Sequence, residues 1–402
     1  MKYDFTTILE RKGHDALAVD ALGEPGFPGL PEEGWSVIPM WVADMNFPVP
    51  PVIQEHLNRR LSHPAFGYFE PSEEYYSAIV SWQEKRNRVS GLTKDQIGYE
   101  NGVLGGLMSA LTVICVPGDR ILVHEPTYIG FRHSLSNAGY RLVPSPLVRD
   151  GDGVWRMDFE DMERKFREKN IHAMIFCSPQ NPSGRVWTAE EMERMMDLCR
   201  RYDVYVISDE IWSDLILTHS PVSHTPLQNL SEEARQRTIA LYAPSKTFNL
   251  AGLVGSYHII RNPRLKAQVD RASSLSHYNS MNVLSMHALI GAYSEEGQEW
   301  LEELRQVLSR NVQYAVERIR SEWDGVSLFC PEGTYMLFPD CGGWCRKKGI
   351  TMEELLKAGW DKGVAWQDGR PFGGTHTVRI NLALPYSRVE EAFDRLKKYV
   401  FT

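Results

Sequence analysis

The 402-residue chain lacks the features that mark nucleic-acid-binding and membrane proteins. Its 44 Lys and Arg are outnumbered by 52 Asp and Glu, the net charge is −8 at pH 7, and no run of basic residues gathers into a stripe. This composition is unlike that of a nucleic-acid binder. The longest mainly apolar stretch, 103–116, is too short to cross a bilayer. We therefore expect no nucleic-acid or membrane partner, and a small-molecule substrate instead.

Cysteine pairs and an export signal are also missing. The six cysteines are scattered without a CxxC pair, and the start of the chain is polar where a secretory signal carries a basic and then an apolar segment. Cys341, Cys345 and His376 are near one another in the sequence, but their spacing matches no common metal site. The sequence predicts a cytoplasmic protein with reduced thiols and no metal ion.

Short β-branched runs alternate with amphipathic helical patterns through the middle of the chain. The runs predicted as strands are 120–123, 173–177, 204–207, 239–242 and 257–260. Between two of them, Thr188 and Glu191 form a capping box. The apolar residues that follow at helical spacing are Met192, Met195, Met196 and Cys199. This alternation is typical of an α/β protein with a mostly parallel central sheet and helices on both faces.

The pattern changes in the last quarter of the chain. The predicted elements there are a long amphipathic helix over 300–319, a strand at 336–338, a helix over 352–362 and a strand at 377–381. They indicate a smaller α+β domain. The expected boundaries are an N-terminal segment 1–47 that joins the small domain, a large ligand-binding domain 48–290 and a C-terminal small domain 291–402. No repeat or Ser/Gly linker separates them, so we expect close packing.

Three consecutive predicted strands end in polar residues suited to chemistry. Asn181 follows the first strand, Asp209 the second and Lys246 the third. In an open parallel sheet, ligands bind beyond the carboxyl ends of the strands, so these three side chains are expected to line one site. Each alone has a simpler explanation: Asn-Pro is a common turn, Asp caps helices, and a lysine is usually solvated. An active site is favoured because all three residues occur together, each at the end of one of three consecutive strands.

An anion site is indicated where a loop enters the apolar helix. Gly102, Val103 and Leu104 lie at that point, so their amides and the helix dipole suit a phosphate, although Gly102 alone also fits an ordinary turn. Ser245, next to the lysine, adds a hydroxyl. Neither GxGxxG nor GxxxxGK[ST] occurs in this segment, which argues against a dinucleotide or a nucleoside triphosphate.

These motifs, in this order, resemble the fold-type I pyridoxal-phosphate enzymes of the class I and II aminotransferase superfamily, in which NPxG, DE and SK recur. The resemblance implies that pyridoxal 5'-phosphate is the cofactor. Lys246 would form a Schiff base with it and later remove the substrate's α-proton. Asp209 would keep the pyridine nitrogen protonated, so that the ring withdraws electrons. Asn181 would donate to the ring oxygen beside the aldehyde.

The resemblance also implies roles for the surrounding residues. The other residues expected to bind the cofactor are Tyr128, stacked on one ring face, Ile211 on the other, Trp212, and Val103, Leu104 and Ser245 at the phosphate. The substrate's α-carboxylate would lie against Arg379, because a planar guanidinium can donate to both carboxylate oxygens at once. The backbone near Ala43 would complete the carboxylate site. Asn181 and Tyr128 would contact the substrate as well. Taken alone, Arg379 also fits a strand-edge arginine.

Further stretches are similar to one branch of that superfamily, the MalY/PatB group of cystathionine β-lyases and related C–S lyases. They are 40–45, 66–68, 178–187, 208–215 and 245–253. In that branch the Tyr of an FGY segment reaches the phosphate of the neighbouring subunit, so Tyr68 implies a homodimer with shared active sites. Val254 stands where many transaminases carry a phosphate-binding arginine, which also fits the lyase branch.

Three residues depart from the branch pattern. Asn46 stands where the branch usually has Asp, Gln180 where it usually has His, and Trp212 where related enzymes have Tyr or His. An indole can only donate one hydrogen bond, so Trp212 leaves the tuning of the ring oxygen and the substrate preference open.

The expected reaction is β-elimination, in which cystathionine or a related L-cysteine S-conjugate gives a thiol, pyruvate and ammonia. An aminotransferase of an L-amino acid is the alternative, because the same residues serve both reactions. A regulatory protein that binds the cofactor without turnover is a third possibility, disfavoured by the intact Lys246 and Asp209. The physiological side chain and any regulatory partner stay open.

Overall fold

The computed structural model describes residues 1–275 and 279–402. Within these residues, eight strands form one large sheet in the order β2-β9-β8-β7-β6-β3-β4-β5. The strands are β2 (Ile97–Glu100), β3 (Arg120–Glu125), β4 (Arg141–Arg149), β5 (Trp155–Met157), β6 (Ile171–Cys177), β7 (Tyr205–Asp209), β8 (Thr238–Tyr242) and β9 (Ser256–Ile259). The pairs β4–β3, β3–β6, β6–β7 and β7–β8 are parallel. At the edges of the sheet, β5, β9 and β2 add antiparallel pairs. The mostly parallel sheet is therefore confirmed.

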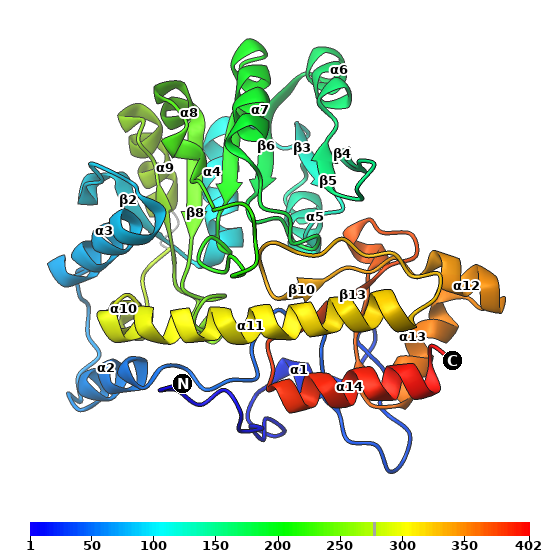
Figure 1. Cartoon of the computed structure of the whole chain (residues 1–402). Helices are drawn as coiled ribbons and strands as arrows, with labels where there is room; N and C mark the ends of the chain where they lie inside the picture. The colour runs from blue at the N-terminus through cyan, green and yellow to red at the C-terminus, as the bar shows by residue number, and fades with distance from the viewer. Residues whose placement is uncertain (276–278) are drawn as a thin grey trace.

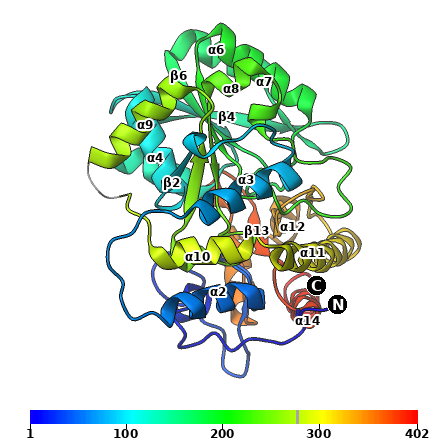
Figure 2. The same cartoon turned by 90° about the vertical axis from the view of Figure 1, so that its left-hand side faces the viewer.

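Helices cover both faces of this sheet, because its central strands are apolar on both sides. Along β3, Ile121 and Val123 pack in one core and Leu122 in the other. The first core is closed by α4 (Gly102–Ile114), α5 (Ile129–Asn137) and α9 (Pro263–Leu275). The second is closed by α6 (Phe159–Lys169), α7 (Ala189–Arg201) and α8 (Glu232–Arg237). Figure 2 shows α4 and α9 on one side of the strands and α7 on the other.

Helix α7 begins as the sequence predicts. Thr188 Oγ1 accepts from the Glu191 amide at 3.2 Å, and Glu191 Oε2 accepts from the Thr188 amide at 2.9 Å, which completes the capping box. Met192, Met195 and Cys199 are then buried against the sheet. The methionine stripe is therefore core packing.

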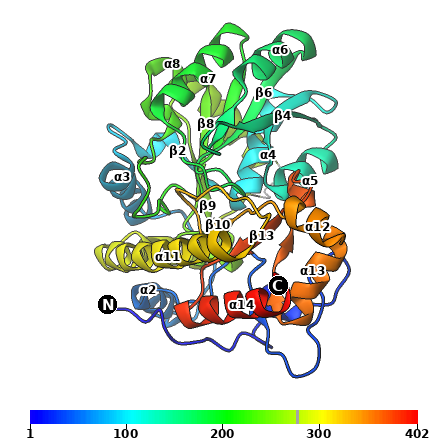
Figure 3. The same cartoon turned by 45° about the vertical axis from the view of Figure 1, so that its right-hand side comes forward.

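A smaller layer lies below the large sheet. Its strands are β1 (Ile38–Pro39) with β11 (Val364–Ala365), and β10 (Met336–Leu337), β13 (Val378–Asn381) and β12 (Gln367–Asp368). Its helices are α1 (Leu17–Asp20), α12 (Gly342–Lys348), α13 (Met352–Asp361) and α14 (Tyr386–Tyr399). Figure 3 shows β10 and β13 beneath the large sheet with α12 and α13 beside them. The β1–β11 pair joins the N-terminal segment to the C-terminal part, and the domain boundaries themselves stay a prediction.

Helix α11 (Glu295–Glu322) runs along the lower layer, next to α14 (Figure 1). The remaining helices are α2 (Pro51–Leu61), α3 (Glu73–Asn87) and α10 (Val283–Ala292). The apolar stripe predicted for 300–319 is buried in α11, as Leu304, Leu308 and Val312 show. No helix in the described part of the chain combines the length and apolar character needed to cross a membrane.

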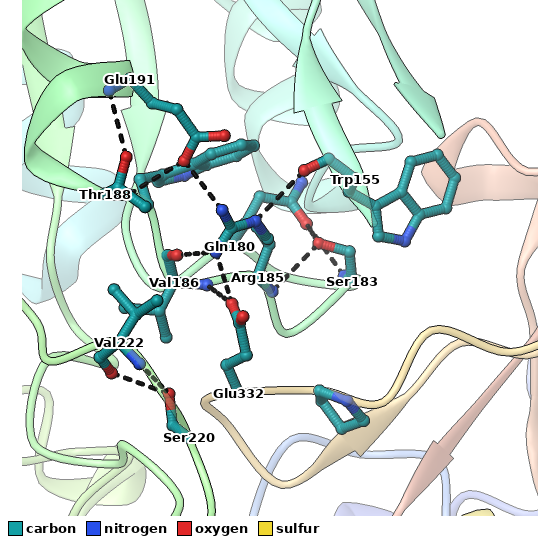
Figure 4. A network of polar contacts seen from close by, with 12 residues as sticks. Trp155, Gln180, Ser183, Arg185, Val186, Thr188, Glu191, Ser220, Val222 and Glu332 are labelled. Carbon is teal, nitrogen blue, oxygen red and sulfur yellow. Dashed lines mark hydrogen bonds and ion pairs between the residues drawn. The ribbon is translucent and has the colours of Figure 1, made fainter. Parts of the chain in front are cut away.

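A buried charge network joins the loop after β6 to the lower layer (Figure 4). Arg185, 1% exposed, donates to Glu332 Oε2 at 2.6 Å and to Glu191 Oε2 at 2.8 Å. The Val186 amide donates to the same Glu332 oxygen at 2.9 Å. Gly184 has φ +73°, and a Cβ there would lie 2.3 Å from Pro331 Cβ, so only glycine fits. The network therefore fixes this loop against the segment that leads to β10.

We expect Glu332→Ala to lower the free energy of unfolding by about 3 kcal/mol, because it leaves the buried guanidinium of Arg185 without one of its two carboxylate partners. The matched control is Glu353→Ala, which removes an exposed partner of Arg370 and should cost less than about 1 kcal/mol. Urea unfolding followed by circular dichroism measures both. Equal losses in the two variants would show that the Arg185 network contributes little.

Candidate active site

The three strand ends singled out in the sequence are neighbours in the structure. β6, β7 and β8 are adjacent and parallel, with Cys177 opposite Asp209 in the register, so their carboxyl ends open on one edge. A cavity of about 220 Å³ lies at this edge. The predicted residues that line it are Ala43, Val103, Leu104, Tyr128, Asn181, Asp209, Ile211, Trp212, Ser245 and Lys246. The fold therefore gathers nearly the whole expected set.

Lys246 lies in the turn after β8, with its amine inside the site. Its Nζ donates to the Ala43 carbonyl at 2.8 Å and lies 5.8 Å from the centre of the Trp212 ring. Burial, helped by the positive charge of Arg379, lowers the pKa of Lys246 to about 8, although Asp44 and Asp209 oppose the shift. A substantial fraction of the amine is therefore neutral near physiological pH, as a nucleophile or general base requires.

Asp209 is the last residue of β7 and is 5% exposed. Burial raises its pKa to about 7, while the Ile211 amide, 3.1 Å from Oδ1, and the charge of Lys246 hold the increase in check. The chain continues as a turn, so Asp209 is not the cap of a helix. A cationic group of a ligand beside this carboxylate would restore its ionised form, because opposite charges favour each other's ionisation.

Arg379 comes from β13 of the lower layer and is 4% exposed. Its Nη1 donates to Asn181 Oδ1 at 3.3 Å, and Nη2 donates to the Trp41 carbonyl at 2.9 Å and to Gln367 Oε1 at 2.5 Å. All three acceptors are neutral, Nε has no partner among the described residues, and burial lowers the Arg379 pKa to about 10. A buried guanidinium with only neutral partners is well suited to bind a carboxylate.

The Tyr128 ring owes its position to a glycine. A Cβ on Gly130 would lie 2.3 Å from Tyr128 Cε1, so any larger residue would displace the ring. The ring also packs edge-on against Phe131 at 5.5 Å between centroids. Burial raises the Tyr128 pKa, so the hydroxyl stays protonated. Tyr128 and Ile211 both line the cavity.

The start of α4 lines the cavity. Gly102 has φ +76°, and Val103 and Leu104 in the first turn line the cavity together with Ser245. A helix start of this kind favours a phosphate, because unpaired amides and the helix dipole both attract negative charge. The structure thus places the residues predicted to bind the phosphate in the lining of one cavity.

Ala251 and Val254, which follow Lys246 in the sequence, also line the cavity. From the sequence, Val254 is noted only as the position of an absent arginine, and neither residue is predicted to be part of the site. Val254 has φ +52°, a conformation that β-branched residues rarely adopt, and the Tyr99 hydroxyl donates to its carbonyl at 2.9 Å. Their closeness to Lys246 in the sequence could have indicated that they lie near the site. Their position at the cavity, however, depends on how the chain after Lys246 folds back, which the sequence alone does not show.

Tyr68 does not reach the cavity of its own chain. It lies between α2 and α3 and is fully exposed, next to the exposed Phe66. Its expected role at a neighbouring subunit therefore stays a prediction.

The three departures from the branch pattern have visible contacts. Gln180 Nε2 donates to the Pro126 carbonyl at 2.6 Å, which fixes the loop after β6 to the segment that carries Tyr128. Asn46 Oδ1 accepts from Arg11 at 2.9 Å. Trp212, fully buried, packs edge-on against Tyr335 at 4.8 Å between centroids. Gln180 therefore has a structural role in positioning the site.

The thiols considered as metal ligands have other neighbours. Cys345 Sγ lies 3.7 Å from Met352 Sδ, and Cys341 is buried in the core. Among the residues that the structure describes, no three His, Cys, Asp or Glu side chains are placed to bind a metal ion.

Comparison with known proteins identifies the family. Residues 37–396 match the family described as aminotransferase class I and II. The chain belongs to this family. Cystathionine beta-lyase PatB of Bacillus subtilis (strain 168) is 31% identical over 396 residues, covering 98% of this chain and 99% of PatB.

Two solved structures are similar over nearly the whole chain. A PLP-bound putative aminotransferase from Clostridium difficile 630 matches with a TM-score of 0.90 and 33% identity, covering 98% of this chain and 99% of the other. The PLP-bound C–S lyase from Staphylococcus hominis matches with a TM-score of 0.87 and 29% identity, covering 98% of each. The fold of this class I and II aminotransferase family member is thus that of PLP-bound enzymes.

We expect Arg379→Gln to raise the pKa of Lys246 from about 8 toward its ordinary value, because a nearby positive charge disfavours the protonated amine. After hydroxylamine removes any bound aldehyde, reductive alkylation with a small aldehyde across a pH series, read by peptide mass spectrometry, gives the midpoint. Arg370→Gln, which changes an exposed arginine of the lower layer, is the control. An unchanged midpoint in Arg379→Gln would contradict the electrostatic account.

Proposed function

We propose that the protein is a pyridoxal-phosphate-dependent C–S β-lyase that cleaves cystathionine or related L-cysteine S-conjugates. The observation that carries this proposal is one cavity that combines Lys246, Asp209 and Asn181 beside the buried Arg379. PatB, a cystathionine beta-lyase by name, and the C–S lyase of Staphylococcus hominis support the reaction type.

The residues present fit the cofactor. Lys246 would hold it covalently through Nζ, Asp209 would pair with its pyridine nitrogen, and the start of α4 with Ser245 would bind its phosphate. Asn181 would donate to the ring oxygen, Tyr128 and Ile211 would contact the ring faces, and Trp212 would border it. When bound, the cofactor supplies an electron sink that stabilises negative charge at the substrate's α-carbon. The raised pKa of Asp209 and the unpartnered Arg379 Nε both suit a charged ligand in this site.

The protein's own residues then carry out the proton transfers. Arg379 binds the substrate's α-carboxylate, with the backbone at Ala43 and the side chains of Asn181 and Tyr128 nearby, and so fixes the α-carbon. Once the substrate's amine displaces Nζ from the cofactor, the free amine of Lys246, with a pKa of about 8, would take the α-proton, and the electron pair released would lead to cleavage of the β-carbon–sulfur bond. The sulfur leaves with the bonding pair and takes up a proton. With one water consumed, the products are the thiol, pyruvate and ammonia.

We further propose a cytoplasmic homodimer with shared active sites. The loop around Tyr68 projects away from its own chain, and Phe66 and Tyr68 are exposed aromatic side chains that a partner subunit would cover. In the resembling branch this tyrosine reaches the partner's phosphate site, so Tyr68 would complete the cavity of the second chain.

An aminotransferase is the second candidate, favoured by the match to the putative aminotransferase of Clostridium difficile 630. With the cofactor bound, the same residues would also serve amino-group transfer, because removal of the α-proton by Lys246 is common to both reactions. A purely regulatory role is less favoured, because Lys246 and Asp209 are both in place.

The reaction itself is tested with purified yellow protein and cystathionine alone. We expect pyruvate and free thiol to accumulate without any keto acid, and Lys246→Ala to be at least about 10³-fold slower, since it removes both the covalent anchor and the base. Lactate dehydrogenase coupling measures pyruvate, and a disulfide reagent measures thiol. Transfer of the amino group to an added keto acid, with neither pyruvate nor free thiol released from cystathionine, would instead establish an aminotransferase.

Shared active sites are tested by mixing subunits. A Tyr68→Ala chain and a Lys246→Ala chain are each expected to be nearly inactive, but a hybrid dimer would contain one site with both intact residues. After subunit exchange, about a quarter of wild-type activity should return, since half of the dimers are hybrid and each has one good site. No recovery, with exchange verified by native mass spectrometry, would place Tyr68 outside the partner's site.

A further inference from the structure

Lys246 lies beyond the hydrogen-bonded part of the large sheet. The parallel pairing between β7 and β8 ends with Asp209 opposite Leu241, and Lys246 comes later, in the turn that follows β8. Backbone pairing between the two strands therefore does not fix the amine relative to Asp209. Other contacts of the turn must do so.

One such contact joins the Lys246 turn to the loop after β7. Thr247 is fully buried, and its Oγ1 donates to Asp214 Oδ2 at 3.0 Å. Asp214 belongs to the loop that begins after Asp209, so one hydrogen bond connects the neighbour of Lys246 to the chain that carries Asp209. Asp214 itself does not line the cavity. Any effect that it has on the reaction must therefore act through other residues.

The Asp214 carboxylate is held in turn by two helices. It is 5% exposed and accepts from two residues of α3, from Trp82 Nε1 at 3.2 Å and from Arg86 Nε at 3.2 Å. Arg86 Nη1 also donates to Glu302 Oε1 of α11 at 2.6 Å. Hydrogen bonds to a charged acceptor are stronger than those between neutral groups. Asp214 therefore gives Thr247 a fixed anchor.

A second contact ties the far end of the turn to a different segment. Asn249 has φ +58°, and its side chain pairs with both backbone groups of Met45: Oδ1 accepts from the amide and Nδ2 donates to the carbonyl, each at 3.0 Å. This segment carries the Ala43 carbonyl that accepts from Lys246 Nζ. The turn thus has one side-chain contact with the segment of Ala43 and one with the loop after Asp209.

We propose that Asp214 is a positioning residue for Lys246: through Thr247 it fixes the turn after β8 against the loop after β7 and keeps Nζ in place relative to Asp209. The inference rests on the proposed function, in which Nζ holds the cofactor and takes the α-proton. The charge of Asp214 is not among those that shift the pKa of Lys246. Asp214 thus acts on the amine by fixing the chain, not by direct electrostatics.

Thr247→Val is the sharpest test. Asp214→Ala would leave the buried Arg86 without one of its carboxylate partners and so destabilise the whole fold, whereas valine keeps the shape of Thr247 and removes only the hydroxyl. In the holoenzyme we expect kcat for pyruvate formation from cystathionine to fall about tenfold, because the amine is displaced. KM should change by less than about twofold, because Arg379 is untouched.

Two further variants separate positioning from a general loss of structure. Thr247→Ser keeps the hydroxyl, so its kcat should stay within about twofold of that of the unmodified protein. Thr238→Val is the matched control. Thr238 lies at the opposite end of β8, is fully buried, and its Oγ1 has no hydrogen-bond partner among the described residues. The same substitution there should leave kcat unchanged.

The pKa of Lys246 in the cofactor-free protein gives a readout that does not depend on turnover. A displaced turn exposes the amine to water, so the pKa should rise from about 8 by about 0.5 or more in Thr247→Val. It should stay unchanged in Thr247→Ser and in Thr238→Val. Reductive alkylation across a pH series, after hydroxylamine has removed any bound aldehyde, measures the pKa in each protein.

The two readouts fail separately. An unchanged Lys246 pKa in Thr247→Val, or equal losses of kcat in Thr247→Val and Thr238→Val, would overturn the positioning role, and the lyase function would still stand if cystathionine gave pyruvate. If cystathionine gives no pyruvate but the pKa rises in Thr247→Val alone, the lyase function fails and the positioning of the amine stands.

Discussion

Desolvation at the carboxyl ends of β6, β7 and β8 is the constraint on which the site depends. It lowers the pKa of Lys246 to about 8 and raises that of Asp209 to about 7, so each of these opposite groups moves toward its neutral form. Such shifts occur only where side chains meet at an edge sealed by packing. The parallel order of three adjacent strands is what brings them there.

The lower layer adds to the site a buried cation, Arg379, whose hydrogen-bond partners are all neutral. Arg379 lies in β13, and its hydrogen bond to Asn181 joins it to the loop after β6. That same loop is anchored through Arg185 to Glu332, just before β10. Under the proposed function, the residue that binds the substrate's carboxylate and the loop that borders Lys246 would therefore be held together by one connected set of contacts. A neighbouring cavity of about 470 Å³, which Lys246 also lines, extends toward the N-terminal segment.

Much of the fold was predictable from local patterns, and the errors have local causes. The helix predicted over 300–319 is α11, Glu295–Glu322, because its apolar stripe starts at Trp300 while Ser294 caps it earlier, its hydroxyl accepting from the Gly297 amide at 3.1 Å. Prediction from the stripe alone missed this cap. The strand at 257–260 is shifted by one residue to Ser256–Ile259, because strand ends depend on pairing with β2 and β8.

The sequence by itself determined the strand-and-helix alternation and the identity of Asn181, Asp209 and Lys246, because periodicity and short motifs are local. Only the tertiary structure decided that Arg379 meets Asn181, that Val254 turns back to the cavity, and that segment 9–17 walls a second one. Those contacts join residues far apart in the chain or fixed by an unusual backbone angle. Burial, and with it the pKa of each group, follows from such packing and has no local signature.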